Sequence, residues 1–258
     1  MSGGTMWTEL LPTEFVALWR RLGLGARPLE LNVQEVGGTT DQARNAYREA
    51  WEGLAARGLV TGDDVDGRLA DVLATLARPS VSVDLRWAVD PGRELRGLAA
   101  ARGEWAAVGV LADGRVWTDT VRAEALVDAV VGLIGRTPRG SGRAVSVAAR
   151  VLDEAAVASG EAGQGFTSAL VEAGMRGNDA RMLTAVVSAP RLRAGQLGAA
   201  ARDGLGRRRR APGVVNVFDT VEGRYALYER SGYVTVAPAD ERRITNLVLE
   251  LLQSIDLG

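Results

Sequence analysis

The sequence predicts an α+β protein in which a central antiparallel sheet is flanked by helical bundles. Residues 81–89 alternate strictly between apolar and polar side chains, which is typical of a strand with one buried face. Residues 211–255 run as short strands joined by tight turns and continue into an amphipathic helix. Residues 103–134 show the same order of strand, turn, strand and helix. This recurrence predicts two pseudo-symmetric halves that arose by internal duplication.

Helices precede the strand at 81–89. Residues 47–55 place apolar side chains at helical spacing, and residues 65–76 do so again before Arg78-Pro79 ends the helix. One face of the strand holds Val81, Val83, Leu85, Trp87 and Val89, and the other holds Ser82, Asp84, Arg86 and Ala88. We expect the second face to be solvent-exposed, which would make it a docking platform or plain surface.

Each half ends in a hairpin followed by a helix. Asp113-Gly114 is a strong turn signal in the first half. In the second half, turns at Glu222-Gly223 and Ser231-Gly232 separate three strands, and Asp240 is placed to cap the last helix. Between the first strand and the hairpin we expect a long loop in both halves, at residues 90–104 and at residues 201–212.

Matching landmarks divide the chain. Leu54 and Leu170, Pro79 and Pro190, and Gly114 and Gly223 are each separated by about 110 residues. The chain is therefore expected to divide into residues 1–137 and residues 138–258, two halves sharing one sheet as a single structural domain. Residues 135–143, rich in Gly, Pro and Ser, would be the linker or hinge between them.

The chain contains no His, no Cys and no Lys, because all 31 of its basic residues are Arg. These absences exclude zinc sites, Ser-His and Cys-His nucleophiles, Schiff-base chemistry and a P-loop lysine. The acidic stretch 63–67 is a poor calcium loop, because Leu73 stands where the last ligand is needed. The sequence therefore predicts a protein that is not an enzyme, with no catalytic residue, no metal and no cofactor.

The N-terminus has neither a basic segment nor an apolar segment of the kind found in secretory signals, and no apolar run is long enough to cross a bilayer. We therefore expect a cytoplasmic protein with no membrane partner. The formal net charge of -1 gives no general attraction to nucleic acid.

Arginine and tryptophan side chains mark the expected binding surface. The candidates lie on the polar strand face, in or beside the expected loop 90–104, and in the Arg-rich loop 202–210. They are Arg86, Arg93, Arg96, Trp105, Arg207, Arg208, Arg209 and Arg210. A central contact of this kind dominates the energy of an interface. The four consecutive arginines are expected to repel one another, so that their loop is mobile until a partner binds.

Three segments together resemble the EspG family, which is associated with ESX (type VII) secretion in actinobacteria. They are F-x-x-L-W-x-x-L-G-L-G at Phe15–Gly25, the strand at Ala77–Arg86, and the closing V-x-V-A-P-A-D at Val234–Asp240. The resemblance extends over residues 7–256. It implies a cytosolic, substrate-specific chaperone that binds the apolar tip of the PPE member of a PE–PPE heterodimer and keeps it soluble before export. It implies no catalytic residue.

Other functions remain open from the sequence. The Arg-rich loop 202–210 would suit an anion- or nucleic-acid-binding protein, and a self-associating scaffold, such as a homodimer, needs no client at all. Within the chaperone interpretation, the client could also be another helical-hairpin substrate of the secretion system.

Overall fold

The computed structural model describes residues 7–34, 40–159 and 165–258. The elements before the linker are β1 (Thr8–Leu10), α1 (Pro12–Arg21), the 3-10 helix η1 (Leu29–Leu31), α2 (Thr40–Ala56), β2 (Val60–Thr61), β3 (Asp64–Val65), α3 (Gly67–Ala77), β4 (Val81–Asp90), β5 (Arg93–Arg102), β6 (Trp105–Ala112), β7 (Arg115–Arg122), the 3-10 helix η2 (Ala123–Ala125) and α4 (Leu126–Gly132). After it come β8 (Val145–Ala148), α5 (Ala149–Ser159), α6 (Phe166–Glu172), α7 (Gly177–Ser188), β9 (Arg193–Arg202), β10 (Arg208–Arg210), β11 (Val215–Thr220), β12 (Gly223–Arg230), β13 (Tyr233–Pro238) and α8 (Glu241–Gln253).

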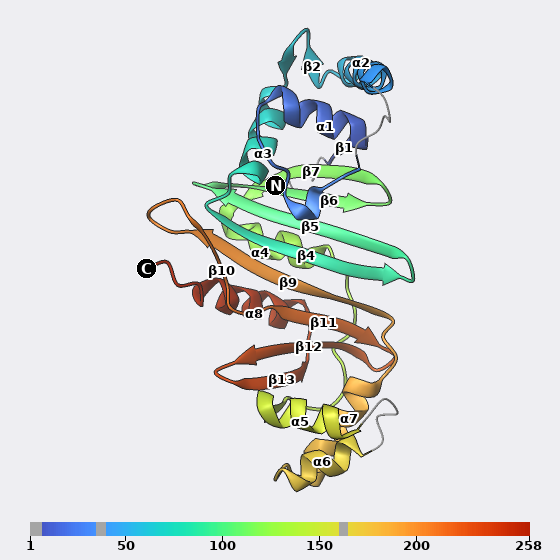
Figure 1. Cartoon of the computed structure of the whole chain (residues 1–258), viewed down its shortest axis with the longest axis vertical. Coiled ribbons are helices and arrows are strands. Elements are labelled where there is room, and N and C mark those ends of the chain that lie inside the picture. Colours follow the sequence, from blue (N-terminus) through green and yellow to red (C-terminus); the bar gives the residue numbers. More distant parts are fainter. Residues whose placement is uncertain (1–6, 35–39, 160–164) are drawn as a thin grey trace.

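In the described part of the chain, one antiparallel sheet has the strand order β1-β7-β6-β5-β4-β9-β11-β12-β13-β8, with β10 also paired to β9 (Figure 1). β4 and β9 meet in the middle, where Leu85 lies opposite Leu197. The expected antiparallel sheet with flanking helices is therefore confirmed, and its two central strands come from different halves of the chain.

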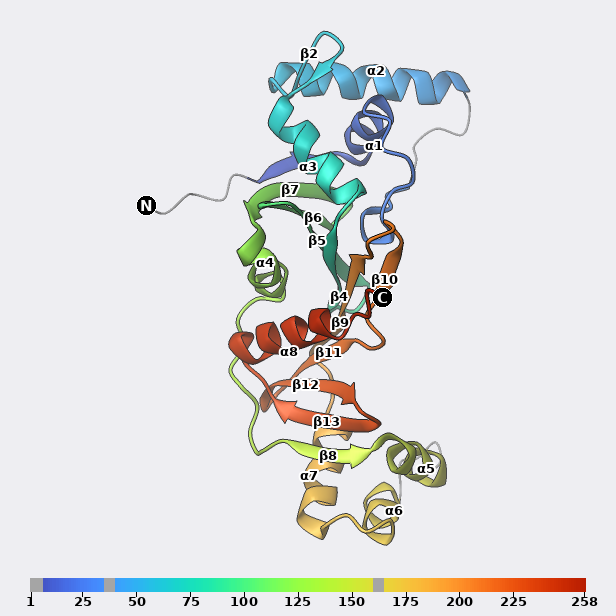
Figure 2. The same ribbon diagram turned by 90° about the vertical axis from the view of Figure 1, so that its left-hand side faces the viewer.

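Helices cover the two faces of the sheet differently. α4 and α8 pack over its centre on one face, against residues such as Leu85, Val108 and Val217. The other face carries α1, α2 and α3 at one end, over Leu98 and Ala107. At the far end of that face, α5, α6 and α7 cover Phe218 and neighbouring side chains. Figure 2 shows these two bundles at opposite ends of the elongated molecule, so no helix of the described residues lies over the middle of this face.

Residues 93–102 form a strand, so the prediction of a loop over 90–104 is wrong. β5 pairs with β4 on one side and with β6 on the other. Its sequence contains three Ala and one Gly, which are weak strand formers. The strand forms because these small residues fit between the helices on both faces; a Cβ on Gly97, for example, would collide with Leu133.

The polar face of β4 is also less exposed than the alternation predicts. Arg86 and Ala88 are exposed, but Ser82 and Asp84 are buried. Asp84 is buried because Arg210 reaches across β9 to it, over Gly198, which lies directly opposite Asp84 and has no side chain. The bundle that begins with α1 extends over this half of the strand, so only the other half stays open.

The two parts of the chain have similar orders of elements: an edge strand, helices, sheet strands and a final helix, with β10 as an additional strand in the second part. The turn Asp113-Gly114 corresponds in this order to Ser231-Gly232, and not to Gly223 as the sequence offset suggested. Both turns have positive φ at both residues, with 48° and 73° in the first and 51° and 77° in the second. These facts favour the duplication, which stays a prediction together with the division into residues 1–137 and 138–258.

The linker 135–143 is hydrogen-bonded to the second half and is therefore not a free hinge. Arg224 donates to the carbonyl oxygens of Ile134 and Gly135 and to Thr137 Oγ1. The amide of Gly140 donates to the carbonyl of Arg224 at 3.0 Å. These hydrogen bonds hold the linker against the N-terminal end of β12.

Candidate functional site

The middle of the sheet, on the face that carries the two terminal bundles, is a surface that no helix of the described residues covers. We call it the open sheet face. It is a shallow hollow formed by β4, β5, β9, β11 and β12. It is lined by Arg86, Ala88, Glu94, Arg191, Ala194, Gly195, Gln196, Asn216, Val217, Phe218 and Leu227. Small apolar residues form much of its floor, and polar and charged side chains stand among them.

Arg86 stands near the centre of the open sheet face. Its neighbours across the strands are Arg96 on β5 and Gln196 on β9. Arg96 forms an ion pair with Glu94 at 2.7 Å. Within the residues that the structure describes, no carboxylate pairs with Arg86. Its guanidinium is therefore available to a partner that supplies an acidic group or carbonyl oxygens.

Arg191 forms the far wall of the open sheet face, beside Phe218. Its guanidinium carbon lies 3.4 Å from the centre of the Phe218 ring. Burial lowers the pKa of Arg191 below its usual value. A cation stacked on an aromatic ring presents a flat, partly apolar surface to a partner. The sequence patterns did not single out Arg191 or Phe218, because only the pairing of β9 with β11 brings these two residues together.

Arg93 and Trp105 lie away from the open sheet face. Arg93 lies where the β4–β5 turn meets the β6–β7 turn, between Asp90 and Asp113. Its hydrogen bond to Asp113 is the main reason that the pKa of Arg93 is raised above its usual value. Trp105 begins β6 at the other end of the sheet, opposite Arg102, and is 65% exposed. The structure therefore does not bring Arg93 and Trp105 together with Arg86.

The Arg-rich segment is an ordered hairpin, so the expectation of a mobile loop at 201–212 is wrong. Arg208–Arg210 form β10, which pairs with β9. Arg209 pairs with Asp203 at 3.0 Å, and Arg210 makes two hydrogen bonds to Asp84. The bond to Asp84 is the main cause that raises the pKa of Arg210. Carboxylates thus neutralise two of the four arginines, which the run of like charges alone could not reveal.

Asp203 organises the tip of this hairpin. Its carboxylate accepts hydrogen bonds from the amides of Leu205 and Arg207, at 3.0 and 2.8 Å, and from Arg209. The bond from the Arg207 amide is the first cause of the lowered pKa of Asp203. Because the folded-state pKa is depressed, this stabilisation is present above the unfolded pKa and is lost as the pH falls through the folded one.

We expect the Asp203→Asn variant to loosen the hairpin at neutral pH. Amide hydrogen exchange at Leu205 and Arg207 should accelerate, while exchange in β4 stays unchanged, because the substitution removes the charged acceptor only at the tip. In the wild type the same loss of protection, measured relative to the intrinsic exchange rate at each pH, should appear on acidification below the range in which Asp203 is ionised. Unchanged exchange in the variant would show that the hairpin does not depend on this carboxylate.

The described residues contain neither a cluster of acidic side chains suited to a metal ion nor a helix long and apolar enough to cross a membrane. The acidic stretch 63–67 instead supplies Asp66, which caps α3 by accepting from the amide of Leu69. Asp240 caps α8 in the same way, as its position in the sequence predicted.

Comparison with known proteins identifies the family. A model of the EspG family matches residues 12–250. The chain belongs to the EspG family. No curated protein matches it significantly. Among solved structures, the fold of this EspG-family chain is similar to that of EspG5, a chaperone of the Mycobacterium tuberculosis type VII secretion system, solved in complex with the PE25–PPE41 dimer. The TM-score is 0.75, the identity is 20%, and 98% of each chain is covered.

Proposed function

We propose that this protein is a cytoplasmic, non-enzymatic chaperone of type VII secretion, which binds the apolar tip of a PE–PPE heterodimer or of a similar helical client before export. The observation that carries the proposal is its membership of the EspG family over nearly the whole chain. The likeness to EspG5, which was solved with a PE–PPE dimer, supports this choice of client.

The open sheet face supports the proposal physically. A helical tip with apolar residues aggregates when exposed, and a chaperone must cover it without enclosing it. A shallow hollow with Ala88, Ala194 and Leu227 offers apolar area, while the guanidinium of Arg86 can bind the carbonyl groups at a helix end. A sheet that packs against helices on its other face supplies a rigid platform, so little order has to be gained on binding.

Client binding tests the proposal. The chaperone and a PE–PPE pair from the same genome should form a complex that survives gel filtration, and the Kd can be measured by calorimetry. We expect Arg86→Ala to weaken binding by about 2 kcal/mol, because a central charged contact is lost. Arg122→Ala, an exposed strand arginine at the end of β7, should change it by less than about 0.5 kcal/mol.

The possible results test the identity of the client and the position of its binding surface separately. If no PE–PPE pair of that genome binds the wild type, the proposed client is wrong. If the client binds but Arg86→Ala binds as tightly as Arg122→Ala, the chaperone function stands and the open sheet face is not its central contact.

A further inference from the structure

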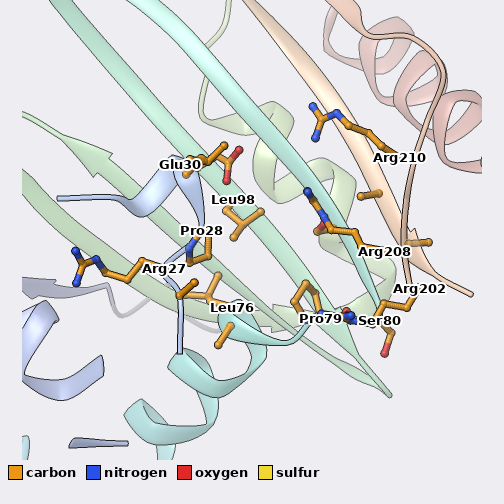
Figure 3. Close-up of a pocket in the computed structure, with 16 residues that line it drawn as sticks. Arg27, Pro28, Glu30, Leu76, Pro79, Ser80, Leu98, Arg202, Arg208 and Arg210 are labelled. Carbon is orange, nitrogen blue, oxygen red and sulfur yellow. The ribbon is translucent and has the colours of Figure 1, made fainter. Parts of the chain in front are cut away.

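A second hollow lies at the edge of the α1–α3 bundle, where residues 26–30 face the β9–β10 hairpin (Figure 3). Its floor is apolar, with Leu76, Leu98 and Ala200. Its walls are charged: Arg27 and Glu30 come from residues 26–30, while Arg202, Arg208 and Arg210 come from the hairpin. The volume of the hollow is about 210 Å³, enough for one or two side chains of a partner.

The two hairpin arginines are an unusual pair. Arg202 and Arg208 are directly opposite each other across β9 and β10. Like charges in this position destabilise a sheet unless something neutralises them. Among the described residues, no carboxylate forms an ion pair with either guanidinium. Two neighbouring acids are already paired with other arginines, Asp203 with Arg209 and Asp84 with Arg210.

Arg202 is held ready for an anion. Its Nε donates to the carbonyl of Pro79 at 3.0 Å, and its Nη1 donates to the carbonyl of Gly206 at 2.7 Å. These bonds fix the plane of the guanidinium and leave Nη2 for another acceptor. Carbonyl oxygens do not neutralise the charge. An oxyanion placed between Arg202 and Arg208 would relieve their repulsion and gain charge-assisted hydrogen bonds.

Glu30 decides which anion fits. Its side chain lines the same hollow and is only 8% exposed, and it accepts no hydrogen bond from the residues that the structure describes. Figure 3 shows Glu30 and Arg208 on different walls around Leu98. Because none of the described residues donates to it, this carboxylate can accept an N–H group from the ligand. It also repels a second negative charge, which disfavours phosphate.

We propose that this hollow binds an acidic residue of a protein segment, with its side-chain carboxylate between Arg202 and Arg208 and a backbone N–H donated to Glu30. An apolar residue next to the acidic one would lie on Leu98 and against Leu29, which is 68% exposed at the rim. The site is separate from the open sheet face, and it does not depend on the identity of the client.

Short peptides test the site directly. The probe is an aspartyl-leucine dipeptide, acetylated and amidated, and its matched control is the asparaginyl-leucine dipeptide with the same blocking groups. Both are titrated into the full-length 15N-labelled protein. We expect saturable shifts of the amides of residues 201–211 with the aspartyl probe only. Inorganic phosphate should bind more weakly than the aspartyl probe at equal ionic strength.

Variants complete the test. Arg208→Gln, at an exposed position, should weaken the aspartyl probe about tenfold, because a hydrogen bond between two charged groups is lost. The matched variant Arg122→Gln removes the same charge elsewhere and should have little effect. Equal binding of the two dipeptides, equal losses in both variants, or tighter binding of phosphate would overturn the proposal. Thermal unfolding checks that each variant is folded.

Discussion

Replacing Arg224 with Met should lower the free energy of unfolding by about 3–5 kcal/mol, because the change leaves a buried carboxylate without its main partner. Arg224 is 1% exposed and Asp219 is fully buried. The Arg224 guanidinium donates to both carboxylate oxygens of Asp219, at 2.7 and 3.0 Å. It also donates to the carbonyls of Ile134 and Gly135, so the substitution leaves linker acceptors unpaired as well.

The matched control lies on the same strand. Arg230 ends β12 and pairs with Glu250 on the surface at 3.2 Å. Arg230→Met should cost less than about 1 kcal/mol, because water already screens this pair. Urea unfolding of the three proteins gives the comparison. Similar losses for the two variants would show that the buried network is not what holds the linker.

The second large effect is expected at Trp87. Its side chain is 2% exposed and belongs to the core beneath α4 and α8. It lies close to Gly195 on β9, and the Arg224 guanidinium stands 5.4 Å from its ring centre. Trp87→Ala should destabilise the protein by about 3–5 kcal/mol, since it opens a cavity where the two central strands meet.

Trp105→Ala is the natural control for Trp87→Ala. The two side chains have the same size, and Trp105 is largely exposed. The control should change the unfolding free energy by less than about 0.5 kcal/mol. If Trp87→Ala is as mild as Trp105→Ala in thermal and chemical unfolding, the centre of the sheet repacks and the junction between β4 and β9 is not a major source of stability.

Local patterns were sufficient for much of the fold. The alternation at 81–89 predicted β4, the turn Ser231-Gly232 predicted the β12–β13 hairpin, and Asp240 predicted the start of α8. In each case the deciding interaction joins residues that are close in sequence, or reflects a period of two or 3.6 residues. The absence of His, Cys and Lys likewise excluded, from composition alone, the catalytic and metal sites that need those side chains.

β5 and the Arg-rich hairpin could not be predicted in this manner. An Ala- and Arg-rich segment becomes a strand only because two neighbouring strands and helices on both faces accept it. The run Arg207–Arg210 was predicted to be mobile because the partner of Arg210, Asp84, lies far away in the sequence. Asp84 is 126 residues from Arg210 in sequence, so only the folded sheet brings them together.

The sequence by itself determined the class of fold, the resemblance to the EspG family and Arg86 as a surface candidate. Tertiary structure alone decided which candidates share a surface. In the folded protein Arg93 and Trp105 lie away from Arg86, whereas Arg191 and Phe218 line the open sheet face with it. Glu30 lies across a second hollow from Arg202 and Arg208. The physical reason is that a binding surface is set by strand register and helix placement, which depend on contacts between residues far apart in the chain.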